Sequence, residues 1–97
     1  MDKRAIGVFD SGLGGLTVVK EIRKILPNES IIYLGDTARI PYGTRSQETV
    51  TRFSLEDARF LLKENVKCMV VACNTASALS FDSLVKIIKI PVFEVIT

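Results

Sequence analysis

Four short apolar segments alternate along this chain with three longer segments in which apolar residues recur at helical spacing. The short segments are typical of buried strands and cover residues 5–9, 30–34, 67–72 and 90–96. The longer segments predict helices over about 16–26, from 44 or 46 to about 65, and over about 75–88. Strand, helix and strand in succession form a right-handed crossover between parallel strands. The alternation predicts an α/β fold, a three-layer sandwich with a parallel sheet in the order 2-1-3-4 and helices on both faces.

Local signals predict where the helices begin and end and which side chains they bury. Pro27 and Asn28 end the first helix. Thr44 with Gln47 fits a capping box. Each of the two later helices has two candidate caps, Thr44 or Ser46 and Asn74 or Thr75. The core faces of the first two helices are expected to hold Val18, Val19, Ile22, Ile25 and Leu26, and Val50, Phe53, Ala58, Leu61 and Leu62.

The composition limits the kinds of protein that this chain can be. With 97 residues, 47% of them hydrophobic and 25% charged, it has the composition of one small globular domain. Its net charge of +2 comes from scattered basic residues, which argues against nucleic acid as the main partner. No apolar run approaches the ~18 residues of a membrane span, and the polar start is unlike a signal peptide.

The cysteine and histidine counts narrow the chemistry further. Cys68 and Cys73 lie five residues apart, which is neither a zinc spacing nor a disulfide framework, and no metal site is expected. Reduced cysteines fit a cytoplasmic location. The chain has no histidine, so it can build no Cys-His or Ser-His pair by itself. Acid–base chemistry must therefore use Cys, Asp, Glu, Lys or Tyr.

Polar residues follow three of the predicted strands where ligands bind in parallel sheets, at the carboxyl ends. The three clusters are Asp10-Ser11, residues 36–43, and Cys73 with Asn74 and Thr75. A thiol between a strand and a helix start is favoured as a thiolate by the helix dipole, so Cys73 can act as a nucleophile or base. If strands one and three are neighbours, Asp10 lies beside Cys73 and can steer its proton.

Each of these features also has a purely structural explanation. Free cysteine is a common small core residue, and Asp10 or Ser11 can cap the helix that follows. The glycines between residues 12 and 15 can form a tight turn or an anion-binding nest, but Thr17 breaks the dinucleotide fingerprint. Cys68 lies roughly 16 Å from Cys73 on the opposite face of the strand, so we expect it in the core. A second reacting thiol would have to come from outside this chain.

Three motifs together resemble a known family. Asp10-Ser-Gly-Leu-Gly-Gly-Leu16, Gly35-Asp-Thr-Ala-Arg-Ile-Pro-Tyr-Gly43 and Cys73-Asn-Thr-Ala-Ser-Ala78 stand in the order and spacing of the amino-terminal part of bacterial glutamate racemases. The resemblance to this aspartate/glutamate racemase family implies a cytoplasmic isomerase without a cofactor. Such an enzyme interconverts L- and D-glutamate for peptidoglycan synthesis. Two cysteines act on opposite faces of the substrate.

The same resemblance implies roles for particular residues. Cys73 matches the first of the two cysteines, and Asp10 matches the residue that assists its proton transfer. Five positions match residues that bind the amino acid, namely Ser11, Tyr42, Gly43, Asn74 and Thr75. The family has two similar α/β domains, and its second cysteine lies in a Gly-Cys-Thr-His type motif that this chain lacks.

The resemblance also sets expectations for the chain as a whole. Residues 1–97 are expected to be an incomplete amino-terminal α/β domain, inactive alone, whose partners are glutamate and the remaining half of the same protein. A homodimer is left open. Two alternatives also stay open: an aspartate racemase or related isomerase of the same superfamily, and a non-catalytic racemase-like binding or regulatory module.

Overall fold

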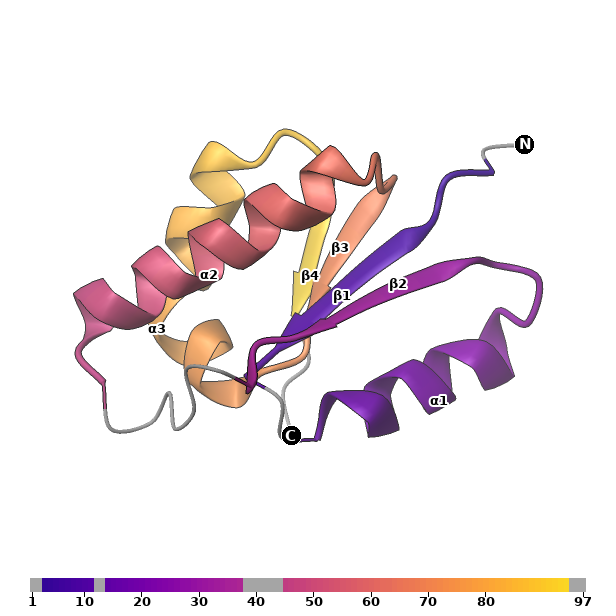
Figure 1. Ribbon diagram of the computed structural model, residues 1–97, viewed down its shortest axis with the longest axis horizontal. Coiled ribbons are helices and arrows are strands. Elements are labelled where there is room, and N and C mark those ends of the chain that lie inside the picture. The colour runs from indigo at the N-terminus through magenta and orange to yellow at the C-terminus, as the bar shows by residue number, and fades with distance from the viewer. Residues whose placement is uncertain (1–2, 12–13, 38–44, 95–97) are drawn as a thin grey trace.

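A four-stranded parallel sheet lies between helices on both of its faces (Figure 1). The computed structural model describes residues 3–11, 14–37 and 45–94. The sheet has the order β2-β1-β3-β4, which confirms the predicted fold class and strand order. In chain order the elements are β1 (Ile6–Asp10), α1 (Gly15–Ile25), β2 (Ile31–Gly35), α2 (Gln47–Lys63), β3 (Cys68–Val71), α3 (Asn74–Ile87) and β4 (Val92–Glu94).

The direction of the crossovers explains which helix covers which face. The chain steps from β1 to β2 in one direction, and then passes back over β1 to reach β3 and β4. Because crossovers are right-handed, this reversal puts α1 on one face and both α2 and α3 on the other, as Figure 1 shows. The reversal occurs between β1 and β3, and such switch points are where open α/β sheets bind ligands.

The strand register assigns side chains to the two faces. Val8 pairs with Tyr33 of β2 and with Val70 of β3, and Val70 pairs with Phe93. These four residues share the face that α1 partly covers. The opposite face, under α2 and α3, forms the main core, whose buried members include Phe9, Val50, Phe53, Ala58, Leu61, Met69, Val71, Ala76 and Leu84.

The structure selects one of the two predicted caps of α2 and corrects the predicted cap of α3. Ser46 caps α2, with its side chain accepting a 3.2 Å hydrogen bond from the Thr49 backbone N–H. Gln47 forms no capping box, because it is the first helical residue and its Nε2 donates to the Leu79 carbonyl across to α3 at 2.9 Å. Thr44, the other candidate cap, lies outside the described residues. The cap of α3 is neither Asn74 nor Thr75 but Cys73 itself.

Some residues assigned to the core faces are exposed. Ile25, Leu26 and Leu62 have exposed fractions of 74%, 46% and 38%, and Val18, Val19 and Ile22 are only half-buried. For the residues of α1, the reason is that this helix packs mainly on β1 and β2, at the edge of the sheet. Only a narrow stripe of α1 is therefore buried against the sheet. Among the described residues, no helix combines the length and the apolar character that crossing a membrane requires.

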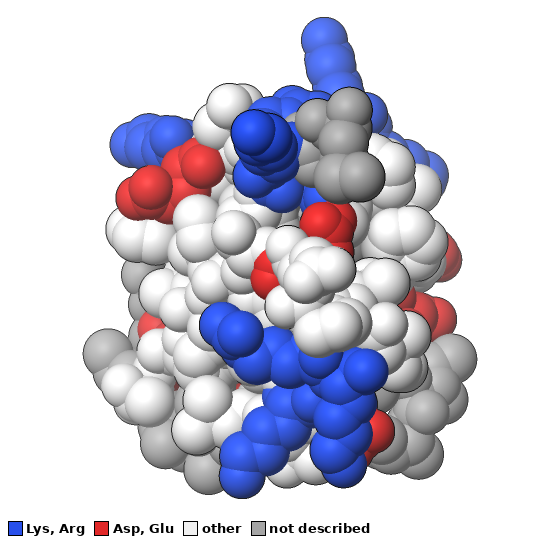
Figure 2. Space-filling view, turned by 90° about the vertical axis from the view of Figure 1, so that its right-hand side faces the viewer, with Lys and Arg blue, Asp and Glu red and all other residues white. Residues whose placement is uncertain are grey.

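The basic residues of one face form local groups. Figure 2 shows Lys and Arg side chains gathered low on this face, over α1, and again at its top, with mainly uncharged surface between. The exposed Lys20, Arg23 and Lys24 belong to α1. A surface that tracks a nucleic-acid backbone needs a continuous basic stripe, which this face does not present.

Candidate active site

The tip of β1 is tied to both of its neighbouring strands. The Asp10 carbonyl accepts a 2.9 Å hydrogen bond from the Asp36 backbone N–H, and the Phe9 carbonyl accepts one of 2.9 Å from the Ala72 N–H. Phe9 pairs with Val71 in the register, so Asp10 lies level with Ala72, one residue before Cys73. The structure thus brings the predicted carboxylate and thiol to the same edge of the sheet, at the switch point. Figure 1 shows α1 and α3 both beginning at this edge.

Cys73 occupies the N-cap position of α3. Its backbone is extended, with φ −99 and ψ 121, and its carbonyl accepts a 2.9 Å hydrogen bond from the Ser77 N–H. Only 5% of the residue is exposed. As the N-cap, the residue lies directly beside the first N–H groups of α3, which carry the positive end of the helix dipole. The thiol is therefore closer to the helix start than the sequence predicted.

Asp10 is fully buried and is contacted from two directions. The Tyr33 hydroxyl donates a hydrogen bond of 2.7 Å to Asp10 Oδ1. The first residue of α1, Gly15, approaches so closely that a Cβ placed there would lie 2.1 Å from Asp10 Oδ2. Burial, the hydrogen bond to Asp10 and the charge of Asp10, in that order of size, together raise the pKa of Tyr33 to about 12. Tyr33 therefore stays protonated and able to donate.

Sequence reasoning missed Tyr33. It lies inside the predicted strand over residues 30–34, three residues before the predicted polar cluster that begins at Asp36. The available signal was its even spacing from Gly35, which puts both residues on the face that Asp10 shares. That signal becomes informative only once the register of β2 against β1 is known.

The remaining predicted residues divide into three groups. Ser11 follows Asp10 directly and is buried, with 6% of it exposed. Asn74 and Thr75 form the first turn of α3, where Asn74 is exposed and Thr75 half-buried. Tyr42 and Gly43 lie outside the described residues. The structure thus brings five of the seven predicted site residues to one sheet edge: Asp10, Ser11, Cys73, Asn74 and Thr75.

Cys68 begins β3 at the other end of the strand, as expected. It is half-buried, so its assignment to the core was wrong. It lies on the face of the sheet that α1 covers only in part. Both cysteines are free thiols. Within residues 3–11, 14–37 and 45–94, no three His, Cys, Asp or Glu residues are grouped so that they could hold a metal ion.

Known proteins resemble this chain over almost all of its length. No family model matches it. The glutamate racemase of Geobacter metallireducens is 62% identical over 96 residues, which cover 99% of this chain and 36% of that protein. The glutamate racemase of Carnobacterium is 55% identical over 96 residues, with the same shares. By sequence, the chain is similar to glutamate racemases. It spans about 36% of the length of these curated relatives.

Solved racemase structures have the same fold. The glutamate racemase of Thermus thermophilus in complex with β-chloro-D-alanine matches with a TM-score of 0.91 and 53% identity, over 95% of this chain and 36% of that one. The glutamate racemase of Francisella tularensis in complex with D-glutamate matches with a TM-score of 0.91 and 55% identity, over 97% and 36%. The racemase-like fold thus rests on sequence and structure together.

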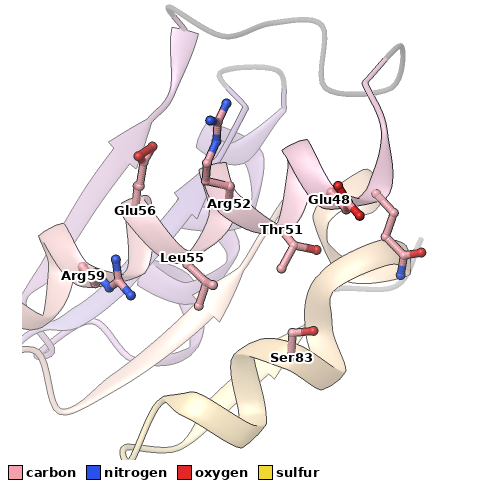
Figure 3. A pocket seen from close by; sticks show the side chains of 8 residues that line it. Glu48, Thr51, Arg52, Leu55, Glu56, Arg59 and Ser83 are labelled. Carbon is pink, nitrogen blue, oxygen red and sulfur yellow. The ribbon is translucent and has the colours of Figure 1, made fainter.

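A groove of about 680 Å³ lies elsewhere on this racemase-like fold, between α2 and α3. Figure 3 shows Thr51 and Leu55 of α2 and Ser83 of α3 along it, with charged side chains of both signs beside them. None of the predicted site residues lines the groove. Alternating Glu48, Arg52, Glu56 and Arg59 give it no single sign of charge with which to select an ionic substrate. The strand edge with Asp10 and Cys73 is the better candidate for chemistry.

Proposed function

We propose that this chain is the amino-terminal part of a glutamate racemase and that Cys73 transfers a proton at the α-carbon of glutamate. The observation that carries the proposal is the placement of Cys73 at the cap of α3, with Asp10 on the adjoining strand tip. The similarity to glutamate racemases supplies the reaction class.

The proposed reaction needs a base, an acid and a way to hold the carbanion. The Cys73 thiolate removes the α-proton, so the C–H bond breaks and an S–H bond forms, leaving the electron pair on the α-carbon. A second thiol, outside this chain, then donates its proton from the opposite face. Asp10 assists the proton transfer at Cys73. Because an α-proton is a weak acid, preorganised positive groups at the reacting centre lower the barrier most.

The binding of glutamate is proposed to use the same sheet edge. Helices α1 and α3 both begin at this edge. The backbone N–H groups of a helix's first turn can donate hydrogen bonds to a carboxylate. We assign substrate contacts to Ser11, Tyr42, Gly43, Asn74 and Thr75. No cofactor is required by this two-thiol scheme.

The remaining part of the protein is proposed to be a second α/β domain that faces the carboxyl edge of the sheet and contributes the second thiol. Acid and base must stand on opposite faces of the substrate, and a cleft between two domains provides this arrangement. Residues 1–97 alone are then inactive. We place the complete enzyme in the cytoplasm, where it supplies D-glutamate for peptidoglycan.

The test is substitution of Cys73 by alanine in the complete protein that carries this chain, with conversion of D- to L-glutamate followed by circular dichroism. Loss of a general base costs at least about a hundredfold, so kcat/KM for glutamate should fall by that factor or more. Cys68→Ala is the matched control, because Cys68 lies at the other end of β3, and its activity should stay near that of the parent.

Four outcomes would contradict the proposal. Unchanged racemisation by Cys73→Ala would remove Cys73 from the mechanism. Racemisation of aspartate in preference to glutamate would favour the related isomerase, and glutamate binding without turnover would favour a binding module. Racemisation by residues 1–97 alone would refute the need for a second thiol.

A further inference from the structure

The contact between Tyr33 and Asp10 joins two neighbouring strands at the proposed site. Tyr33 is paired with Val8 in the register, two residues before Asp10 on the same face of β1. Its side chain therefore reaches forward along the sheet toward the strand tip. The hydroxyl donates to Asp10 Oδ1 at 2.7 Å, a length typical of a bond to a charged oxygen.

Two glycines leave the space that this pair occupies. A Cβ at Gly35 would lie 2.9 Å from the Tyr33 hydroxyl. A Cβ at Gly15 would lie 2.1 Å from Asp10 Oδ2 and 2.8 Å from Tyr33 Cε1. Real Cβ atoms essentially never approach so closely. The two glycines come from different elements, α1 and β2. At both positions the absence of a side chain leaves room for the Tyr33–Asp10 pair.

Burial makes this hydrogen bond important for Asp10. The residue has no exposed surface, and a buried carboxylate is costly unless polar groups compensate for its lost hydration. A donor on a rigid strand also selects one orientation of the carboxylate. Tyr33 remains a donor throughout the neutral range, because its pKa is raised to about 12.

We propose that Tyr33 is a positioning residue, which holds the Asp10 carboxylate in its working orientation at the tip of β1, next to β3, which leads into Cys73 at the cap of α3. The proposal rests on the proposed function, since it assigns Tyr33 to proton transfer at Cys73. Tyr33 itself touches neither the substrate nor the thiol in this scheme. Its effect passes through Asp10.

The experiment is Tyr33→Phe in the complete protein, which keeps the ring and removes only the hydroxyl. Because hydrogen bonds to charged groups are the strong ones, kcat should fall roughly ten- to a hundredfold, while KM for glutamate stays close to the parent value. The α-deuterium isotope effect should rise in the direction in which Cys73 removes the proton. A variant that merely lowers the folded fraction would also lower kcat but would leave the isotope effect unchanged.

A double-mutant cycle with Asp10→Asn separates an action through Asp10 from an independent one. If Tyr33 works through Asp10, Tyr33→Phe should cause little further loss in the Asp10→Asn background. Thr51→Val is the matched control, because Thr51 and Ser80 share a 2.8 Å hydroxyl hydrogen bond between α2 and α3, away from Asp10. Its kcat and isotope effect should equal those of the parent.

A second variant covers the case in which Tyr33→Phe does not fold. Gly35→Ala keeps the hydroxyl but forces it to shift, so it should change kcat and the isotope effect in the same direction by a smaller factor. The inference is overturned if the parent racemises glutamate and Tyr33→Phe matches it, or if the losses from Tyr33→Phe and Asp10→Asn simply multiply. A parent protein without glutamate racemisation overturns the proposed function, and the role of Tyr33 in it.

Discussion

The ionisation of Tyr33 depends on its burial and on the charge of Asp10. The pKa of Tyr33 is raised first by burial, and then by its hydrogen bond to Asp10 and by the charge of Asp10, to about 12. A phenolate at this position would lose solvation and would face a carboxylate at hydrogen-bond distance. Folding therefore favours the protonated tyrosine, which has a consequence for stability at high pH.

We expect the Tyr33 contribution to stability to be complete below pH 10 and to disappear between pH 10 and about 12. In that window the unfolded chain has released the tyrosine proton while the folded chain still holds it, so the free energy of unfolding falls as the pH rises. A difference of two pKa units corresponds to at most about 2–3 kcal/mol. Urea unfolding of this chain at several pH values between 9 and 12 measures it.

Tyr33→Phe is the control for this titration, because it has no phenolic proton. Lysine also titrates at high pH, so the informative quantity is the difference between the two proteins. That difference should be constant below pH 10 and should change above it. Equal slopes in both proteins would contradict the assigned pKa.

Single residues differ in how far the sequence could predict them. Asp10 and Cys73 were predictable, because each directly follows an apolar run and the carboxyl ends of parallel strands meet at one edge. Tyr33 was not, because its contact depends on register, and a slip of one residue would turn it to the opposite face. The exposure of Asn74 and the half-burial of Thr75 likewise depend on where α3 begins.

At the scale of secondary-structure elements, the sequence predicted which helices and strands the chain forms, but not the residues at which they begin and end. The apolar periodicity identified all four strands and three helices of the described chain. Asparagine and threonine both cap helices well, so the sequence offered Asn74 or Thr75, but the hydrogen bond from the Ser77 N–H to the Cys73 carbonyl makes Cys73 the cap. The point at which the chain leaves β3 therefore decides where α3 begins, rather than the preference of single residues for the cap position.

The start of α2 offers a direct test of a cap that the structure identifies. Ser46→Ala removes the acceptor for the Thr49 N–H and should lower the free energy of unfolding by about 1 kcal/mol. Ser46→Asp keeps an acceptor and should stay near the parent value, since Asp caps as well as Ser. Urea denaturation measures both. Equal losses in the two variants would show that Ser46 stabilises the protein by some other contact.

At the scale of the whole molecule, the two faces of the sheet are covered unequally. Val8 is fully buried, whereas Phe93, in the same row two strands away, is 56% exposed. The cause is topological: in the described part of the chain this face is covered by α1, which packs mainly on β1 and β2. The order of the strands was predictable from the alternation, but the extent of cover was not, because it depends on how far a single helix reaches across the sheet.

This unequal cover predicts self-association of the isolated 97-residue chain. Phe93 lies on β4, the edge strand opposite β2, and exposed apolar edges promote pairing between molecules. Phe93→Lys should raise the protein concentration at which oligomers appear in sedimentation velocity, because a charge on an edge strand opposes association. Ile25→Lys is the matched control, since Ile25 is 74% exposed but lies on α1 rather than on a strand edge. Equal effects of the two lysines would assign association to general surface hydrophobicity, and a parent chain that stays monomeric at every concentration would contradict the prediction.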